Sequence, residues 1–571
     1  MTQFHLTPED VRAAVIGDGD AMPGPFGPRP LVYADYVASG RALAFIEDAI
    51  RAHVLPSYGN THTETSYTGR ETTRLREMAR EAVRHAVGAD DGHAVIFTGS
   101  GATAAIDRLA RCLDLGRRGE GAPRGVVFVG PYEHHSNDLP WREANVDLVR
   151  IPLDDAGAVC LDALRRALIA HAGARLKIGA FSAASNVTGV RTDLPALTRL
   201  LHAHGARSVI DFAAAAPYIP VHLAQSAPGA GDRIDAAFLS PHKFPGGPGA
   251  SGILVADREM IAGPLPGVVG GGTVSYVTAT AHTYVTDPER REEGGTPGII
   301  ENIRAGMVLQ LKSDIGAEEI ARREHDLAER LRAGLAPVPG LHLLGPADAP
   351  RLGIFSFNLV AGARGLHHNF VVALLNDLFG LQTRGGCSCA GPYGHALLGI
   401  DEAHAARHEG AVHRGLAAFR PGWARLGVNY FFSDAQVDYI SAAIALIARR
   451  GGDLIKLYRL DAASGVWRVR ADAPGRVAPD PCGPEFAVPR ALTDLWAMPA
   501  PARGAPPDFT FCLAQAERIA DLAAAAPTPA PESFDAAAEA LRWFWMPHEA
   551  GAIPKGGPDR TGPDHPERNA A

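Results

Sequence analysis

The stretch KIGAFSAASNVTGVRTDLPALTRLLHAHGARSVIDFAAAA, residues 177–216, decides the fold. Its apolar runs KIGAFSAAS and SVIDFAAAA flank the helical pattern LPALTRLLHAHGA, and both runs end in small or polar residues. Short apolar runs that alternate with helices are typical of βα units, whose parallel strands are buried on both faces. The stretch therefore predicts a strand–helix–strand unit.

Three further runs extend this rhythm: AVIFTGS (94–100), GVVFVGP (125–131) and AAFLSPH (236–242). The helical pattern GATAAIDRLARCL follows the first of them at 101–113. We therefore predict an α/β fold whose large, mostly parallel sheet lies within residues 31–300. Reactive side chains in such folds belong at the carboxyl ends of the strands, which is where polar residues occur in this chain.

The pattern changes after residue 300 and predicts a smaller α/β domain over residues 301–451. The expected elements are an amphipathic helix at 315–338, the strands FSFNLV (355–360) and RLGVNYF (425–431), and a closing helix at 434–450. Residues 1–30 are expected to form a separate N-terminal segment, with a short helix followed by a loop in which prolines block regular structure.

Residues 452–571 are a Pro-rich extension of unknown role. The run IKLYRLDAASGVWRVR (455–470) predicts a hairpin that turns at ASG. Two helical stretches are expected around 512–525 and 533–545, and residues 554–571 are expected to be disordered. The extension is too short and too rich in proline for a second catalytic domain to be assigned to it.

Composition excludes some classes of protein. The 571 residues are 46% hydrophobic and 21% charged, which is ordinary for a soluble globular protein. A net charge of −8 argues against a nucleic-acid partner. No apolar run is long enough to span a membrane, the first residues lack the features of a signal peptide, and six cysteines do not make a disulfide framework. We therefore expect a cytoplasmic protein.

Two strand ends carry candidate binding groups. In TGSGATAAID (98–107) a strand, a Gly/Ser loop and a helix start follow one another, so the backbone N–H groups near Ala102 and Thr103 can bind an anion; a bare strand-to-helix turn is the alternative. In GPYEHHSNDLPW (130–141) we favour aromatic stacking for His134 and leave His135 as a surface residue. No metal site is expected, since the two histidines lack partners at a metal-ligand spacing.

Three further strand ends supply an asparagine, an aspartate and a lysine. Asn186 and Asp211 each follow a strand, and a buried carboxylate such as Asp211 needs a positive partner. Lys243 lies among proline, glycine and phenylalanine, where a lysine is suited to imine chemistry, and Ser240 and His242 beside it can bind an anion. This ordered set fits pyridoxal phosphate, with Lys243 in a covalent imine and Asp211 on the ring nitrogen.

At this point the chain resembles the class V, fold-type I pyridoxal-phosphate enzymes, and most of all the cysteine desulfurases, selenocysteine lyases and related sulfurases. The resemblance covers roughly residues 30 to 450. Each motif alone is weak, but the series stands in the family's order: VYADYVASG, FTGSGAT, EHHSNDLPW, SNVTGV, VIDFAAA, SPHKFPGGPG, GGGTVSY, GGTPGI and RGGCSCAGP.

The resemblance implies a role for each candidate residue. Lys243 carries the cofactor covalently, His134 stacks on its ring, and Asp211 pairs with the ring nitrogen. Its phosphate is held at two strand ends by Ala102, Thr103, Ser240 and His242, and by Thr296 of the neighbouring subunit. The contribution of a neighbouring subunit implies a homodimer. Asn186 and Arg384 bind the substrate carboxylate, for which a guanidinium fork is well suited. In one departure, Ala214 stands where the family commonly has a glutamine.

The segment TRGGCSCAGPYGH (383–395) places Cys389 where desulfurases have the cysteine that forms a persulfide. A flexible Gly-rich loop suits a nucleophile that reaches the substrate and then leaves, and Arg384 and His395 favour its thiolate form. The alternative is a small structural cysteine. Cys387 has three open roles: it accepts sulfur, pairs with Cys389 on oxidation, or has no function.

The resemblance thus implies L-cysteine desulfuration, which gives alanine through a persulfide on Cys389. Two alternatives stay open. One is another class V reaction on a different amino acid, namely aminotransfer, epimerisation or β-elimination; the other is an inactive sulfur-carrier or scaffold protein. A sulfur-acceptor protein is an expected partner, and the extension of residues 452–571 is expected to cover the active-site entrance or to dock that acceptor.

Overall fold

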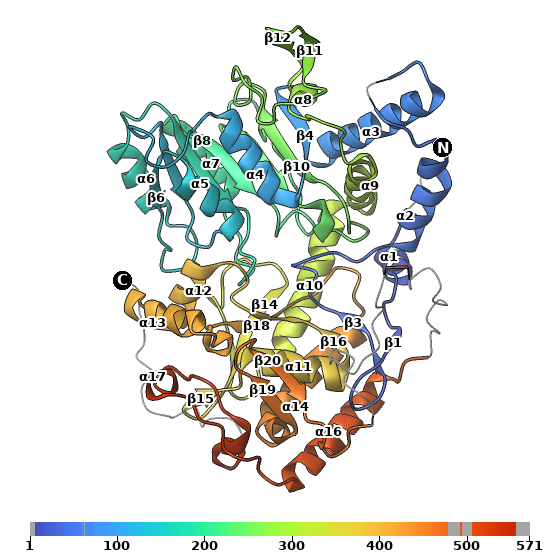
Figure 1. Ribbon diagram of the computed structural model, residues 1–571, viewed down its shortest axis with the longest axis vertical. Coiled ribbons are helices and arrows are strands. Elements are labelled where there is room, and N and C mark those ends of the chain that lie inside the picture. Colours follow the sequence, from blue (N-terminus) through green and yellow to red (C-terminus); the bar gives the residue numbers. More distant parts are fainter. Residues whose placement is uncertain (1–5, 62, 478–491, 494–504, 555–571) are drawn as a thin grey trace. The chain divides into compact units, whose positions relative to one another are not determined.

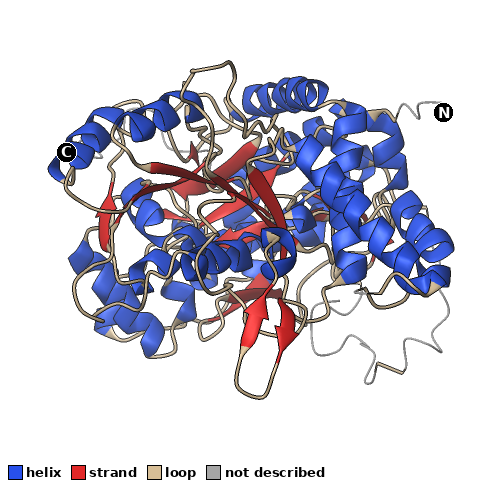
Figure 2. Cartoon of the chain, turned by 90° about the horizontal axis from the view of Figure 1, so that it is seen from above, coloured by secondary structure: helices blue, strands red, loops and turns tan. Residues whose placement is uncertain are grey.

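The computed structural model describes residues 6–61, 63–477, 492–493 and 505–554. The chain divides into two compact units. Unit 1 consists of Met1–Ile16, Tyr36–His325 and Gly345–Leu352, and unit 2 of Gly17–Asp35, Asp326–Leu344 and Gly353–Ala571. Of residues 554–571, which were predicted to be disordered, all but Pro554 lie outside the described part of the chain. Both units mix helices and strands, as the colouring by secondary structure shows (Figure 2).

Unit 1 is built on a seven-stranded sheet in the order β4-β10-β9-β8-β7-β5-β6 (Figure 1). Strand β10 pairs antiparallel with β4 and β9, and the strands from β9 to β6 are parallel. The predicted large, mostly parallel sheet is therefore confirmed. Its strands are β4 (His93–Gly99), β5 (Val126–Val129), β6 (Asp147–Arg150), β7 (Lys177–Ser182), β8 (Arg207–Asp211), β9 (Ala236–Leu239) and β10 (Gly252–Asp257).

The βαβ unit of β7, α7 and β8 shows why these residues fold in this way. Helix α7 (Leu194–Ala203) begins after Asp193, whose carboxylate caps the helix by accepting the N–H of Ala196 at 3.0 Å. The helix packs closely on β7, because a Cβ atom at Gly179 would lie 2.5 Å from the side chain of Leu201. Apart from Lys177 and Arg207 at their first positions, β7 and β8 are buried, so they have the continuous burial of central parallel strands.

The other elements of unit 1 connect or flank this sheet. The helices are α1 (Pro8–Ala14), α2 (Ala44–Ala49), α3 (Tyr67–Ala86), α4 (Gly101–Cys112), α5 (Leu139–Glu143), α6 (Leu161–Ala170), α8 (Pro288–Arg291) and α9 (Ile299–Ile315). Strands β11 (Val274–Val277) and β12 (His282–Tyr284) form a separate antiparallel hairpin. Helix α10 (Ala317–Leu335) begins in unit 1 and ends in unit 2.

Unit 2 contains a five-stranded sheet, in which β13, β14, β18 and β17 follow one another and β15 pairs with β14. These strands are β13 (Leu341–Leu343), β14 (Ile354–Ala361), β15 (Arg364–Gly365), β17 (Arg384–Gly386) and β18 (Trp423–Gly427). Three short strands bring the segment 17–35 to this unit, since β1 (Ala21–Met22) pairs with β2 (Arg29–Pro30) and β3 (Val32–Tyr33) pairs with β16 (Leu381–Gln382).

The helices of unit 2 are α11 (His368–Phe379), α12 (Gly391–Leu398), α13 (Glu402–His413), α14 (Asp434–Leu454), α16 (Phe509–Ala525) and α17 (Ala536–Glu539). The predicted hairpin is confirmed, because β19 (Tyr458–Asp461) pairs antiparallel with β20 (Val466–Val469). No helix in the described part of the chain combines the length and the apolar character that crossing a membrane requires.

Two expected elements of unit 2 are wrong. The strand expected at 425–431 ends at Gly427, and a turn follows it in which the N–H of Phe432 donates to Asn429 O at 2.9 Å. The helix expected at 533–545 is a single turn, α17. After it the chain is extended, since the N–H of Gly365 donates to Trp543 O and the N–H of Trp545 to Gly365 O, both at 3.0 Å. A contact with a residue distant in sequence therefore overrides the local pattern.

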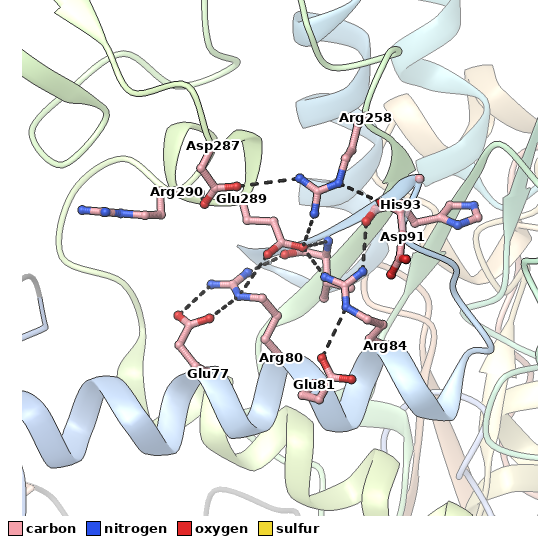
Figure 3. Close-up of polar contacts among 12 residues, drawn as sticks. Glu77, Arg80, Glu81, Arg84, Asp91, His93, Arg258, Asp287, Glu289 and Arg290 are labelled. Carbon is pink, nitrogen blue, oxygen red and sulfur yellow. Dashed lines mark hydrogen bonds and ion pairs between the residues drawn. The ribbon is translucent and has the colours of Figure 1, made fainter.

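Side chains cover the outer edge of the seven-stranded sheet at β4. The backbone N–H groups of Val95 and Phe97 donate to carboxylates of Glu289 and Glu293, each at 2.8 Å. Arg80 and Arg84 of α3 donate to backbone carbonyl groups of the same strand, and Figure 3 shows both guanidinium groups turned toward Glu289. This arrangement satisfies an exposed strand edge without a further strand. It also fixes residues 289–293, which lead to Thr296.

Glu293→Ala is expected to destabilise unit 1 by about 3–5 kcal/mol, because it removes the buried carboxylate that two buried guanidinium groups share. Glu293 is 7% exposed and pairs with Arg76 and Arg80. The control is Glu81→Ala, since Glu81 is 73% exposed beside Arg84 and is expected to contribute less than about 1 kcal/mol. Urea denaturation measures both changes, and equal midpoints for the two variants would contradict this account.

Candidate active site

The carboxyl ends of three neighbouring parallel strands bring candidate residues of unit 1 to one edge of the sheet. Strand β7 ends at Ser182, which is paired in register with Asp211 at the end of β8. Asp211 is in turn paired with Phe238, and β9 ends one residue later, just before Ser240. This edge is where an open α/β sheet places its reactive groups.

Lys243 lies in a single helical turn that follows β9, and its N–H donates to Ser240 O at 2.9 Å. The side chain is half-buried. The glycines after it are required by packing, since a Cβ atom at Gly247 would overlap the carbonyl oxygen of Pro241. The chain therefore folds back tightly on itself after Lys243, and this fold explains why small residues surround the lysine.

Asp211 is buried, with 5% of its surface exposed. Burial raises the pKa of its carboxyl group, while a hydrogen bond from the N–H of Ala213 at 2.8 Å and the positive charge of Lys243 oppose that rise. Within unit 1 the structure therefore brings the predicted lysine and aspartate close enough to interact electrostatically. A buried carboxylate of this kind suits a partner that carries a proton.

The loop before α4 meets the segment of Ser240 and His242. The N–H of Ala102 donates to Ser240 Oγ at 3.0 Å, and a Cβ atom at Gly101 would lie 2.7 Å from His242 Cε1. His242 is neutral, since burial first and the charge of Lys243 second lower its pKa to about 4. The first turn of a twelve-residue helix, a hydroxyl group and an imidazole thus gather at one place.

His134 and Thr103 share a hydroxyl partner. His134 Nδ1 accepts the N–H of Ser136 at 3.1 Å, and Ser136 Oγ lies 2.7 Å from Thr103 Oγ1. These contacts connect the loop after β5 to α4. His135 is half-buried beside His134, and burial lowers its pKa.

The remaining candidates of unit 1 lie in loops. Asn186 is 7% exposed in the turn that follows β7. Thr296 is exposed, and its Oγ1 accepts a hydrogen bond from Asn60 Nδ2 at 3.4 Å. Ala214, in place of the family's glutamine, is buried in the turn after Asp211.

Sequence reasoning missed Glu133, although it stands directly before His134. Its carboxylate accepts hydrogen bonds from Ser182 N at 2.9 Å, Ser182 Oγ at 2.6 Å and Asn137 Nδ2 at 2.6 Å. Burial raises its pKa to about 7, and these hydrogen bonds oppose the rise. Glu133 therefore ties the loop of His134 to the end of β7. Its place in EHH was the signal that could have identified it.

A second group of candidates belongs to unit 2. Arg384 opens β17, is 53% exposed, and donates from Nε to Asp35 Oδ2 at 2.9 Å. Arg425, buried on the paired strand β18, donates to Asp35 Oδ1 at 3.2 Å. Asp35 was not predicted as a site residue, although it lies in the quoted motif VYADYVASG. It holds the guanidinium group of Arg384 in place and leaves much of it open to solvent.

The cysteine loop follows β17 directly. Cys389 is exposed and Cys387 half-buried, and both are free thiols. Ser388 and Cys389 have φ angles of +53° and +54°, a left-handed conformation that costs non-glycine residues on the order of 1 kcal/mol each. No group of three or more His, Cys, Asp or Glu side chains that could hold a metal occurs among the described residues.

Comparison with known proteins adds the family. The family model described as aminotransferase class-V matches residues 32–411. The chain belongs to this family. The residues from 412 onward, including the hairpin and α16, lie outside the matched region of this class-V chain.

Similar proteins carry desulfurase names. The class-V chain is 28% identical over 367 residues to a probable cysteine desulfurase of Halalkalibacterium halodurans, which covers 64% of this chain and 85% of the relative. It is 30% identical over 368 residues, with the same coverage of both chains, to a cysteine desulfurase of Klebsiella pneumoniae. The apo structure of a cysteine desulfurase from Thermococcus onnurineus aligns with a TM-score of 0.63 and 25% identity over 78% of this chain and 98% of that one.

Membership of the class-V family implies pyridoxal phosphate, and the residues of unit 1 fit that group. The first turn of α4 meets Ser240 and His242 at close range, so helix N–H, hydroxyl and imidazole groups gather at one place, as the binding of a phosphate requires. The buried carboxylate of Asp211 suits a protonated ring nitrogen. The amine of Lys243 is a group to which the aldehyde of that cofactor could be attached.

Proposed function

We propose that this class-V enzyme is a pyridoxal-phosphate-dependent cysteine desulfurase. The observation that carries the proposal is Cys389, an exposed thiol that follows the strand of Arg384, in a chain whose relatives carry that name. The substrate's Cβ–S bond breaks and an S–S bond forms at Cys389 Sγ. L-cysteine and the thiol thereby give L-alanine and an enzyme persulfide, so the carbon is reduced and the thiol is oxidised.

The residues of unit 1 hold the cofactor and move protons. When bound, pyridoxal phosphate withdraws electrons from the substrate's α-carbon. Lys243 would attach the cofactor through its Nζ atom. The same nitrogen would carry a proton to and from the substrate carbon. Asp211 keeps the ring nitrogen protonated, and His134 stacks on the ring. The phosphate is held by Ala102, Thr103, Ser240, His242 and, from the neighbouring subunit, Thr296, so the active enzyme is a homodimer.

The residues of unit 2 bind substrate and take up sulfur. Arg384, oriented by Asp35, binds the substrate carboxylate. A free cysteine that must stay reduced suits a reducing compartment, and we place the enzyme in the cytoplasm. A sulfur-acceptor protein then removes the persulfide sulfur.

An amino-acid panel tests this proposal. The purified holoenzyme is incubated with each amino acid in turn, and sulfide, alanine and keto acid are measured together. We expect sulfide and alanine in equal amounts from L-cysteine in the presence of a thiol reductant, without keto acid. Keto acid from another amino acid, with no sulfide from L-cysteine, would identify a different class-V reaction.

Asp211→Asn is expected to lower kcat/KM by at least about 10²-fold, because an amide cannot keep the ring nitrogen protonated and each tenfold loss is about 1.4 kcal/mol in the transition state. The matched control is Asp193→Asn, the exposed cap of α7, since asparagine also caps helices. Steady-state kinetics with L-cysteine give both values. A near-normal rate for Asp211→Asn would remove the ring-partner role.

A further inference from the structure

Part of the C-terminal extension packs on the N-terminus of α11. Asn369 Nδ2 donates to Gly465 O in the β19–β20 turn at 2.8 Å. The ring of Trp467 on β20 lies 5.9 Å from that of His367 and 4.9 Å from that of Phe370. Trp467 is 4% exposed, so the hairpin is docked through a buried aromatic side chain.

A second segment of the extension covers the same helix end. Trp543 stacks on His367 with ring centroids 5.2 Å apart and an interplanar angle of 19°, and on His368 at 5.5 Å and 11°. Phe544 meets His367 edge-on at 4.8 Å. We call His367, His368, Trp467, Trp543 and Phe544 the histidine–tryptophan cluster.

Both histidines of this cluster are neutral. Burial lowers the pKa of His367 to about 4 and that of His368 well below its ordinary value. His367 Nδ1 accepts the N–H of Asn369, and Nε2 donates to Ala418 O, each at 3.0 Å. Both ring nitrogens of His367 thus have partners, and its ring orientation is fixed for stacking with Trp543.

The other side of this helix end contacts the strand before the cysteine loop. At Gly385, in the middle of β17, a Cβ atom would overlap Asn369 Oδ1 and lie 3.1 Å from His368 Cδ2. Gly385 stands between Arg384 and Cys387. His368 and Asn369 therefore touch the extension on one side and the backbone of β17 on the other.

We propose that the C-terminal extension positions β17, which carries Arg384, and the loop of Cys389 that follows it, and that it acts through the histidine–tryptophan cluster and Asn369. Close-packed groups transmit small displacements, so the docking of Trp543 fixes His368 and hence β17. Trp543, His368 and Asn369 are positioning residues. The inference rests on the proposed function only for the role of Cys389, because the mechanical coupling is independent of the reaction.

Trp543→Ala in the full-length holoenzyme tests this coupling. We expect hydrogen exchange of residues 384–391 and the alkylation of Cys389 by iodoacetamide to become about 3- to 10-fold faster, the factor that corresponds to the loss of one aromatic stack. Trp543→Phe, which keeps a stacking ring, is expected to restore most of the effect. Phe511→Ala is the control, because Phe511 is a 50% exposed aromatic residue of the same extension.

The reverse change tests reciprocity, which an energetic coupling requires. Gly385→Ala displaces Asn369, so exchange in residues 458–469 and 543–546 is expected to become faster by a similar factor. If folded Trp543→Ala and Gly385→Ala each alter exchange only around their own position, the positioning role is wrong. That result leaves the proposed function intact, whereas loss of sulfide chemistry with the coupling preserved would overturn the proposed function alone.

Discussion

Lys243→Ala is expected to abolish covalent attachment of pyridoxal phosphate and to lower kcat/KM for L-cysteine by at least about 10⁴-fold, since it removes both the attaching amine and a group that transfers protons. The prediction depends on the place of Lys243 directly after β9, next to Ser240 and His242 and within electrostatic reach of Asp211. Absorbance of the dialysed protein and steady-state kinetics measure the two effects.

Lys177→Ala is the matched control, because Lys177 begins β7 and its Nζ contacts only the carbonyl group of Ala172 at 3.4 Å among the bonds of the described residues. Its activity is expected to be unchanged. Borohydride reduction of the holoenzyme, followed by peptide mapping, identifies the attached lysine. A label on a lysine other than Lys243 would contradict the assignment.

Cys389→Ser is expected to lower the release of sulfide from L-cysteine by at least about 10²-fold while cofactor attachment and cysteine binding stay unchanged. The cofactor residues and the thiol belong to different steps, and a serine hydroxyl of similar size is hardly ionised at neutral pH. Sulfide and alanine assays measure the loss, and the absorbance spectrum measures attachment.

Cys387→Ser is the control for this substitution, because Cys387 lies in the same loop but is half-buried. It is expected to reduce transfer to an acceptor more than it reduces alanine formation. If Cys389→Ser still forms alanine and sulfide at the parent rate, the persulfide mechanism fails, and the paired cysteines are structural.

Local pattern predicted five of the seven strands of the large sheet and missed β6 and β10. β4, β5, β7, β8 and β9 all lie within the runs that predicted them or within one or two residues of them, because the buried strands of this sheet are mostly apolar and are followed by small or polar residues. The order of motifs then led to the family, which residues 32–411 match. Local pattern failed where contacts with residues distant in the chain determine the backbone conformation. Phe544 is an example, because its extended backbone pairs with Gly365.

The same limit applies to the candidate site. Lys243 and Asp211 could be proposed as site residues from the sequence because each follows an apolar run. A charged side chain there costs free energy unless it has a partner. Asp35 and Glu133 were not, because their partners Arg384 and Ser182 are respectively 349 and 49 residues away in the chain. The proposed positioning role of His368 and Asn369 depends on their packing against Gly385. The periodicity of the sequence does not reveal this contact.

The most direct test of the central claim is to locate the transferred sulfur. The wild-type holoenzyme is mixed with L-cysteine for one turnover without reductant, the thiols are alkylated, and the peptides are mapped by mass spectrometry. The account predicts one added sulfur atom on Cys389, with one alanine formed per persulfide. Alanine without added sulfur on Cys389, or sulfur on Cys387 alone, would contradict it.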